Sequence, residues 1–126
     1  MWCLMASPLI YSGDMSKLDE FTLNVLCNPE IIDVNQDPLG ECALVINQTK
    51  ECFLMVKNLA DGSKAVGLFN RGKVASEVTV EWTDLKMTGK QSVRDLWRQK
   101  ELGVSQQKFS TQVPSQGVVM VKISKR

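Results

Sequence analysis

Short runs in which apolar and polar residues alternate fill the chain from residue 43 onward, and they constrain its fold more than any other feature. EVTVEW at 77–82 and VVMVKIS at 118–124 alternate most cleanly, which is typical of antiparallel strands with one face in water. Turn residues such as Asp61-Gly62 and Thr88-Gly89 separate the runs. The strands expected from this pattern are Ala43–Asn47, Cys52–Asn58, Lys64–Phe69, Val78–Trp82, Ser92–Trp97, Lys108–Val113 and Val118–Ile123. Seven short strands of this kind predict a β-sandwich.

The N-terminal 40 residues show a different pattern. Apolar runs at Pro8–Tyr11 and Ile31–Val34 predict two buried strands. Between them, apolar residues recur at helical spacing over Leu18–Leu26, and Asn28-Pro29 is expected to end this helix. Strand, helix and strand in this order predict a βαβ unit with parallel strands.

A lone βαβ unit cannot bury its own strands. About 40 residues are too few for a βα-barrel, which needs about 250, or for an open doubly wound sheet. We therefore expect residues 1–40 to be the end of a larger α/β domain whose earlier part lies outside this chain. The boundary with the β-sandwich is expected near residues 40–42.

Charge and composition exclude several classes of function. Fifteen Lys and Arg residues stand against 14 Asp and Glu, a net charge of +1, so neither nucleic acid nor a membrane surface is expected as a partner. No apolar run approaches the ~18 residues of a membrane-spanning helix. The absence of histidine and of any Cys-x-x-Cys pair argues against a metal site, and no cofactor is expected.

The four cysteines leave two possibilities open. Cys3, Cys27, Cys42 and Cys52 permit two disulfides in three connectivities. Each also lies in an apolar run, where a free buried thiol is the simpler interpretation. We expect four free thiols.

Several motifs resemble those of one known family along essentially the whole chain. They are WCLMASPLIYSGD at 2–14, LCNPEII at 26–32, NQDPLG at 35–40, AVGLFNRG at 65–72, WTDL at 82–85 and VRDLW at 93–97. In this order they resemble the C-terminal portion of the glycoside hydrolase family 27 (melibiase-type) α-galactosidases. NQDPLG is the most telling of them.

The resemblance implies a (β/α)8 barrel followed by a β-sandwich of about eight strands. Residues 1–40 would then be the last two strands and helix of this TIM-type barrel, and residues 41–126 the sandwich. The expected fold is mainly β: a C-terminal antiparallel β-sandwich preceded by a βαβ remnant of a truncated barrel.

The resemblance also implies an activity, the retaining hydrolysis of terminal α-linked galactose from oligosaccharides, glycolipids or polysaccharides. Two carboxyl groups ~5 Å apart would carry it, and in the family both are aspartates on earlier barrel strands. We expect the nucleophile and the acid/base upstream of Met1, so no catalytic residue is assigned here and the chain alone is expected to be inactive. Its full-length parent is expected to act on α-galactosides outside the cytoplasm, in a secreted, periplasmic or lysosomal setting.

Two aspartates are the candidates for sugar binding. Asp14 and Asp37 follow the two predicted strands, on the face where barrel active sites lie. The alternative is that each aspartate caps a helix or turn, beside Gly13 and Pro38 respectively, and this structural interpretation is favoured. The same choice applies to Asn35 and Gln36, where bonds to backbone groups are favoured over bonds to sugar hydroxyls.

Other side chains are assigned structural roles in the same way. Trp82, Trp97 and Tyr11 could stack on a sugar ring. Packing in the sandwich or against the barrel is favoured for Trp82, and Trp97 is expected to mark a strand followed by a turn. Arg94 and Asp95 are expected on a solvated face. Asn47-Gln48-Thr49 fits the N-glycosylation sequon, which has meaning only in a eukaryotic secretory protein.

A second function is considered beside that of a hydrolase fragment. The alternative is a non-catalytic β-sandwich accessory or carbohydrate-binding module. The predicted barrel strands would be exposed in the chain alone, so self-association through them is expected.

Overall fold

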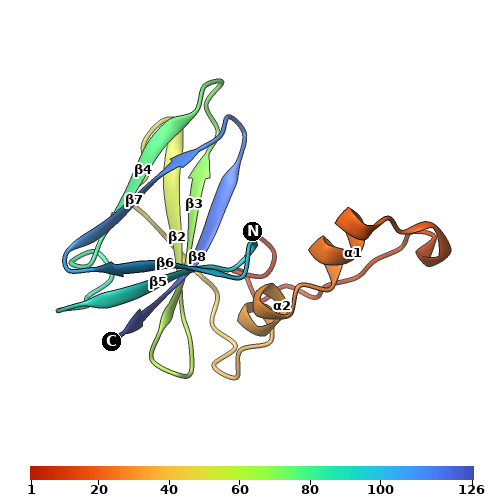
Figure 1. Ribbon diagram of the computed structural model, residues 1–126, viewed down its shortest axis with the longest axis horizontal. Helices are drawn as coiled ribbons and strands as arrows, with labels where there is room; N and C mark the ends of the chain where they lie inside the picture. The colour runs from red at the N-terminus through yellow and green to blue at the C-terminus, as the bar shows by residue number, and fades with distance from the viewer.

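The computed structural model describes residues 1–126, and its strands form two antiparallel sheets (Figure 1). The larger sheet has six strands in the order β1-β2-β3-β8-β5-β6, and the smaller sheet pairs β4 with β7. The strands are β1 (Leu44–Ile46), β2 (Cys52–Asn58), β3 (Lys64–Asn70), β4 (Ser76–Glu81), β5 (Gln91–Asp95), β6 (Lys100–Ser105), β7 (Lys108–Val113) and β8 (Val118–Lys125). The prediction of a mainly β chain with a C-terminal antiparallel β-sandwich is confirmed.

All seven predicted strands are present, and one further strand, β6, was not predicted. β6 pairs only with β5 and forms the outer strand of the larger sheet. Its first five residues are exposed, so its sequence carries no apolar alternation that would mark a strand. Gly103 in β6 has φ +115°, and the register with β5 shifts between Val93 and Arg94.

The first hydrophobic core fills the space between the two sheets. It consists of 11 buried residues that come mainly from alternate positions of the facing strands. They are Leu54, Val66, Leu68, Val78, Val80, Trp82, Leu85, Val93, Val113, Val121 and Ile123. This alternation is the reason that the sequence pattern located the strands.

A second hydrophobic core covers the opposite face of the larger sheet. Six of the seven residues of β3 are buried, because Val66 and Leu68 face the first core whereas Ala65 and Phe69 face the second. The remaining members of the second core are Leu4, Ile31, Val34, Phe53, Met55, Leu59, Leu96 and Met120. Three of these, Leu4, Ile31 and Val34, come from the N-terminal segment, so the start of the chain and residues 31–34 form a third layer on the sheet.

The N-terminal segment forms helices where strands were predicted. It contains a 3₁₀ turn, η1 (Met15–Lys17), and two helices, α1 (Glu20–Leu26) and α2 (Pro29–Asn35). The helix predicted at 18–26 is present as α1. Pro8–Tyr11 has no regular structure, so the prediction of a strand there is wrong.

The predicted strand at Ile31–Val34 is also wrong, because these residues lie in α2. Asn28 is the N-cap of α2, and its side chain accepts a hydrogen bond from the Ile31 N–H at 3.2 Å. Pro29 follows at the first helical position, which suits proline. The dipeptide therefore begins a helix instead of ending one, and Ile31 and Val34 face the sheet at helical spacing.

The βαβ order is thus absent from residues 1–40, and the assignment of this segment to the end of a barrel stays a prediction. None of the three helical segments is long and apolar enough to cross a membrane.

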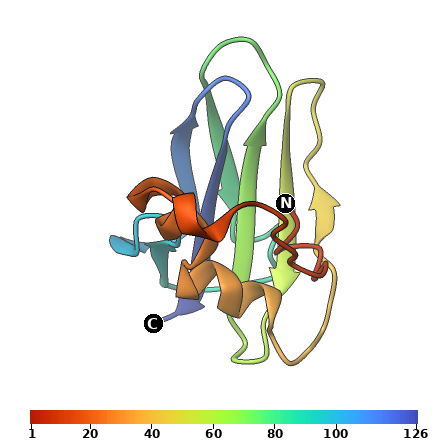
Figure 2. The ribbon, with the colours of Figure 1, turned by 90° about the vertical axis from the view of Figure 1, so that its right-hand side faces the viewer.

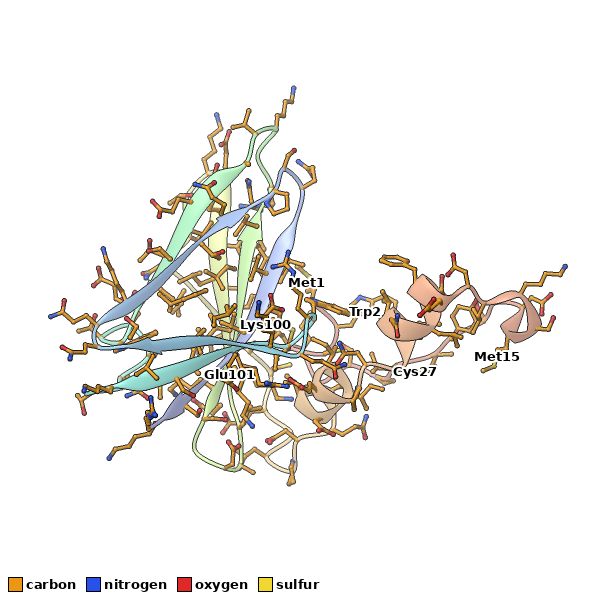
Figure 3. All side chains as sticks on the ribbon, in the orientation of Figure 1. Met1, Trp2, Met15, Cys27, Lys100 and Glu101 are labelled. Carbon is orange, nitrogen blue, oxygen red and sulfur yellow. The ribbon has the colours of Figure 1, made fainter.

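Residues 8–27, which we call the arm, extend away from the sandwich (Figure 1). No residue of η1 or α1 is buried. The labelled side chains of Met15 and Cys27 point into open space in Figure 3. The large apolar residues exposed along the arm are Leu9, Ile10, Tyr11, Met15, Phe21, Leu23, Val25 and Leu26. Self-association through this surface stays a prediction.

The packing of the third layer on β3 gives a first testable prediction. A Cβ atom at Gly67 would lie 2.7 Å from Cδ1 of Leu4 and 2.6 Å from Cε2 of Phe69. Gly67→Ala should therefore lower the free energy of unfolding, measured in urea, by ~1–3 kcal/mol through overpacking. In a Leu4→Ala background one of the two clashes is absent, so the same substitution should have a smaller effect. An equal effect in both backgrounds would contradict the proposed contact with Leu4.

Candidate binding groove beside helix α2

Helix α2 is held on the larger sheet at its N-terminal end by two polar side chains. The side-chain amide of Asn28 donates to the Leu96 carbonyl at 3.0 Å. Glu30, in the first turn of α2, accepts two hydrogen bonds from Arg94 of β5, at 2.8 Å from Nε and 2.6 Å from Nη2. Arg94 also pairs with Glu101 at 3.2 Å. Glu30 and then Glu101 stabilise the guanidinium and raise the pKa of Arg94 above its ordinary value.

The prediction that Arg94 and Asp95 lie on a solvated face is wrong. Arg94 is held by the carboxylates described above. Asp95 is buried, and its carboxylate accepts hydrogen bonds at 3.0 Å from the backbone N–H groups of Trp97 and Arg98. Arg94 therefore fixes β5 against α2, and Asp95 closes the turn that follows β5.

The C-terminal end of α2 is held by a fully buried lysine. Lys57 of β2 has 0% exposure, and its Nζ donates to the Val34 carbonyl at 2.6 Å. No ion pair of Lys57 with a carboxylate is present. The carbonyl groups of the last helical turn carry partial negative charge and complement the ammonium group.

Asn35 links α2 to the start of the chain, and Gln36 bonds to Asn35. The buried Asn35 donates to the Ser7 carbonyl at 2.8 Å and accepts a hydrogen bond from Gln36 at 2.7 Å. The bond of Asn35 agrees with the favoured interpretation, in which the amide satisfies a backbone group. The Gln36 amide donates to a side chain instead.

A groove with a volume of about 400 Å³ opens beside α2. The residues that line it are Glu30, Asp33, Val34, Asp37, Pro38, Leu59, Ala60, Asp61, Arg94, Leu96 and Lys122. The charged groups of the groove are mostly paired. Arg94 is bound to Glu30, and Lys122 pairs with Asp61 at 2.7 Å. Neither cation is therefore left free for an anionic ligand, and the groove has more carboxylates than cations.

The two predicted sugar-binding aspartates lie apart. Asp37 lines the groove, where its carboxylate accepts hydrogen bonds from the Ala60 N–H at 3.0 Å and the Leu39 N–H at 3.1 Å. Asp14 lies on the arm beside Met15, labelled in Figure 3, and caps η1. It accepts hydrogen bonds from the hydroxyl and the N–H of Ser16, at 2.7 and 3.0 Å, which lower its pKa. Both aspartates cap turns, and their contact with a sugar stays a prediction.

The three aromatic side chains considered for sugar stacking differ in their burial. Trp82 is buried in the first core, and its indole N–H donates to the Ser105 carbonyl at 3.2 Å. Packing was the favoured interpretation, and the structure agrees with it. Trp97 and Tyr11 are partly exposed, on different parts of the molecule.

The family-like motifs of the sandwich also have structural roles. Asn70, in AVGLFNRG, is buried and donates to the carbonyls of Val74 and Val113 at 2.8 and 3.0 Å. Its side-chain oxygen accepts from the Gly72 N–H at 2.8 Å, which closes the turn after β3. Arg71 lies over the ring of Phe53, 4.9 Å from its centroid. These residues shape a turn and show no arrangement suited to catalysis.

No group of three or more His, Cys, Asp or Glu side chains is placed to hold a metal ion. All four cysteines are free thiols. Cys27 and Cys42 are exposed, so the expectation that all four are buried is wrong for these two.

Sequence reasoning missed the residues that position α2: Asn28, Glu30, Lys57 and Arg94. One signal was available for Lys57, because this lysine interrupts the apolar run of a central strand. The ion pair between Glu30 and Arg94 joins residues 64 positions apart, so no local sequence pattern predicts it.

The sequence of this chain is similar to those of known α-galactosidases. Residues 49–123 match the family model described as the alpha-galactosidase C-terminal β-sandwich domain. The α-galactosidase of Cyamopsis tetragonoloba is 29% identical over 128 residues, which cover 100% of this chain and 31% of that protein. The chain spans about a third of the length of the curated relatives it matches, or less.

Solved structures of similar proteins have the same fold. α-Galactosidase I from Mortierella vinacea superposes with a TM-score of 0.92 at 32% identity, over 97% of this chain and 33% of that one. A family 27 β-L-arabinopyranosidase from Geobacillus stearothermophilus gives a TM-score of 0.92 at 27% identity, over 98% of this chain and 28% of that one.

The ion pair at the edge of the groove predicts a pH dependence. Asp61 accepts hydrogen bonds from Lys122 and Ser63, which lower its pKa from 3.8 to about 2. Because the folded pKa lies below the unfolded one, the contribution to stability is present above pH ~4 and is lost as the pH falls toward 2. Asp61 is half exposed, so solvent screening reduces this contribution to about 1 kcal/mol.

Urea unfolding of the chain and of Asp61→Asn at several pH values between 2 and 6 tests this dependence. The free energies of unfolding should differ by about 1 kcal/mol at pH 6 and converge toward pH 2. Lys122→Met should show the same convergence. A difference between the two chains that does not change with pH would contradict the role assigned to the pair.

Proposed function

Since the chain belongs to the family of α-galactosidase C-terminal β-sandwich domains, we propose that it works as the non-catalytic C-terminal part of a longer retaining α-galactosidase. The observation that carries the proposal is the family match together with the share of the relatives that the chain spans, about a third. The remainder of such a protein has ample length for the catalytic unit.

The carboxylates of this chain support the proposal. A retaining glycosidase needs two carboxyl groups ~5 Å apart, one free to attack the sugar and the other free to exchange a proton. In the groove, Glu30 and Asp61 bind cations and Asp37 accepts hydrogen bonds from the backbone. Only Asp33 has no bonded partner there, and one carboxylate does not complete the mechanism. The nucleophile and the acid/base then belong to the part of the parent outside this chain.

The substrate proposed for the parent is a terminal α-linked galactose on an oligosaccharide or polysaccharide. The names of the relatives support this class. The arabinopyranosidase from Geobacillus stearothermophilus superposes equally well, which supports a sandwich that does not itself select the sugar. We place the parent outside the cytoplasm, in a secreted, periplasmic or lysosomal setting.

The arm gives this chain its proposed contact with the catalytic part. Its apolar residues are exposed, whereas Leu4, Ile31 and Val34 of the N-terminal segment are packed on the sheet. An exposed apolar surface of this extent is typical of an interaction site. Residues 8–27 are therefore proposed to pack against the catalytic unit of the parent.

The first test is an assay of the purified chain with an aryl α-galactoside. We expect no hydrolysis above the buffer control, because the chain supplies no complete pair of catalytic carboxylates. A full-length α-galactosidase such as that from Mortierella vinacea is the positive control. Turnover by the chain that Asp33→Asn or Asp37→Asn abolishes would overturn the proposal and assign catalysis to the groove.

The second test examines the arm in a chimera. This chain replaces the matched third of the Mortierella vinacea enzyme, in which it superposes over 97% of its length. Phe21 on the arm is 75% exposed and Val74 in the sandwich is 66% exposed, so Phe21→Asp and Val74→Asp introduce the same charge at similarly exposed positions. Phe21→Asp should lower the yield of active chimera at least tenfold, because a carboxylate would be buried at the contact. Val74→Asp should leave activity within twofold of the unmodified chimera. Equal activities for the two variants would exclude the arm from the contact.

A further inference from the structure

The turn between β1 and β2 carries a motif that the proposed function does not use. Asn47-Gln48-Thr49 is the only Asn-x-Ser/Thr sequence in the chain. Asn47 directly follows β1, and all three residues are exposed. The motif therefore lies on the surface, where a large modification can be accommodated.

Asn47 is exposed at the start of the turn. Asn47 has φ +47°, a left-handed conformation that asparagine tolerates better than most residues. Thr49 fixes the rest of the turn, because its hydroxyl accepts from the Cys52 N–H at 2.9 Å and donates to the Cys52 carbonyl at 3.0 Å. The side-chain nitrogen of Asn47 contacts only the exposed carboxylate of Asp84. An amide with one substituent retains one hydrogen, so this contact is compatible with a modified Asn47.

The neighbouring strand is an unprotected edge of the larger sheet. β1 pairs with β2 on one side only. Its residues Leu44 and Val45 are 71% and 52% exposed. An apolar edge strand is a site at which chains pair and aggregate, and a bulky hydrophilic group at its end would obstruct such pairing.

We propose that Asn47 accepts an N-linked oligosaccharide when the chain passes through a eukaryotic secretory pathway, and that this glycan covers the β1 edge. The co-reactant is a lipid diphosphate-linked oligosaccharide. The Asn47 side-chain nitrogen forms a bond to the anomeric carbon of the first sugar, the bond from this carbon to the diphosphate oxygen breaks, and the amide loses one proton. The lipid diphosphate is the leaving group.

The position of the turn keeps the glycan away from the groove and the arm. In Figure 2 the β1–β2 connection lies at the upper end of the sandwich, whereas α1 and α2 lie below it in front of the larger sheet. A glycan at Asn47 is therefore compatible with a catalytic unit packed against the arm.

The test expresses the whole chain behind a cleavable secretion leader in a eukaryotic cell and measures its mass. The unmodified sequence and Thr49→Ser, which preserves the motif and the hydroxyl, should each carry one glycan that peptide N-glycosidase removes. Asn47→Gly tolerates the positive φ but offers no acceptor, and it should show the bare mass. The transfer takes place on the nascent chain, so the readout does not depend on secretion or stability. Recovery of the unmodified sequence with its bare mass would overturn the proposal.

A second measurement addresses the edge. Glycosylated chain and the same material after an endoglycosidase has trimmed the glycan to its first sugar, which leaves the Asn47 amide intact, are warmed, and aggregation is followed by light scattering. Trimming should accelerate aggregation severalfold, and equal rates would overturn the covering role. The inference rests on the extracytoplasmic location proposed above. Neither readout involves hydrolysis, so a failure here is distinguishable from a failure of the proposed activity.

Discussion

The larger sheet is apolar on both faces along its central strands, and the rest of the structure depends on covering both of them. Successive residues of β3 point alternately to the smaller sheet and to the N-terminal segment. The smaller sheet covers one face, and Leu4 with two residues of α2 covers part of the other. Gly67 matters in this arrangement because it leaves the space that Leu4 occupies. The start of the chain around Leu4 and helix α2 are therefore a structural layer of the sandwich, whereas the arm between them is not.

The polar contacts of α2 explain how a helix of seven residues keeps its place. Isolated helices of this length are marginal in water, but α2 is bound at one end through Asn28 and Glu30 and at the other through the buried Lys57. The same contacts engage Glu30 and Arg94 in a pair, so these two charged groups are not free to react. The groove beside α2 thus owes its shape and its charges to the attachment of the helix, which agrees with a supporting role in a larger enzyme.

The sandwich could be predicted from the sequence where one face of a strand is wet, because burial then alternates along the chain. β2 and β7 were predicted with their observed bounds, whereas β6 has almost no buried residue and left no pattern. The apolar run at 31–34 is short enough to fit either a strand or a helix. The Asn28-Pro29 pair decides between the two, because it begins helix α2. In the sequence analysis it was interpreted as the end of the preceding helix. The candidate aspartates were recognised as capping residues, but the residues that hold α2 depend on contacts between distant parts of the chain.

The difference between α1 and α2 bears on where this protein could be divided. α2 is bound to the sandwich at both ends, whereas α1 has no buried residue, so the contacts that hold the helical segment to the sandwich begin at Asn28. A graft of residues 41–126 onto another enzyme would transfer a sheet with one bare apolar face and a lysine with no acceptor. The transplantable unit begins at Asn28, and the recipient must also provide a side chain to fill the site of Leu4. The sandwich and the layer that covers it must therefore be transferred together.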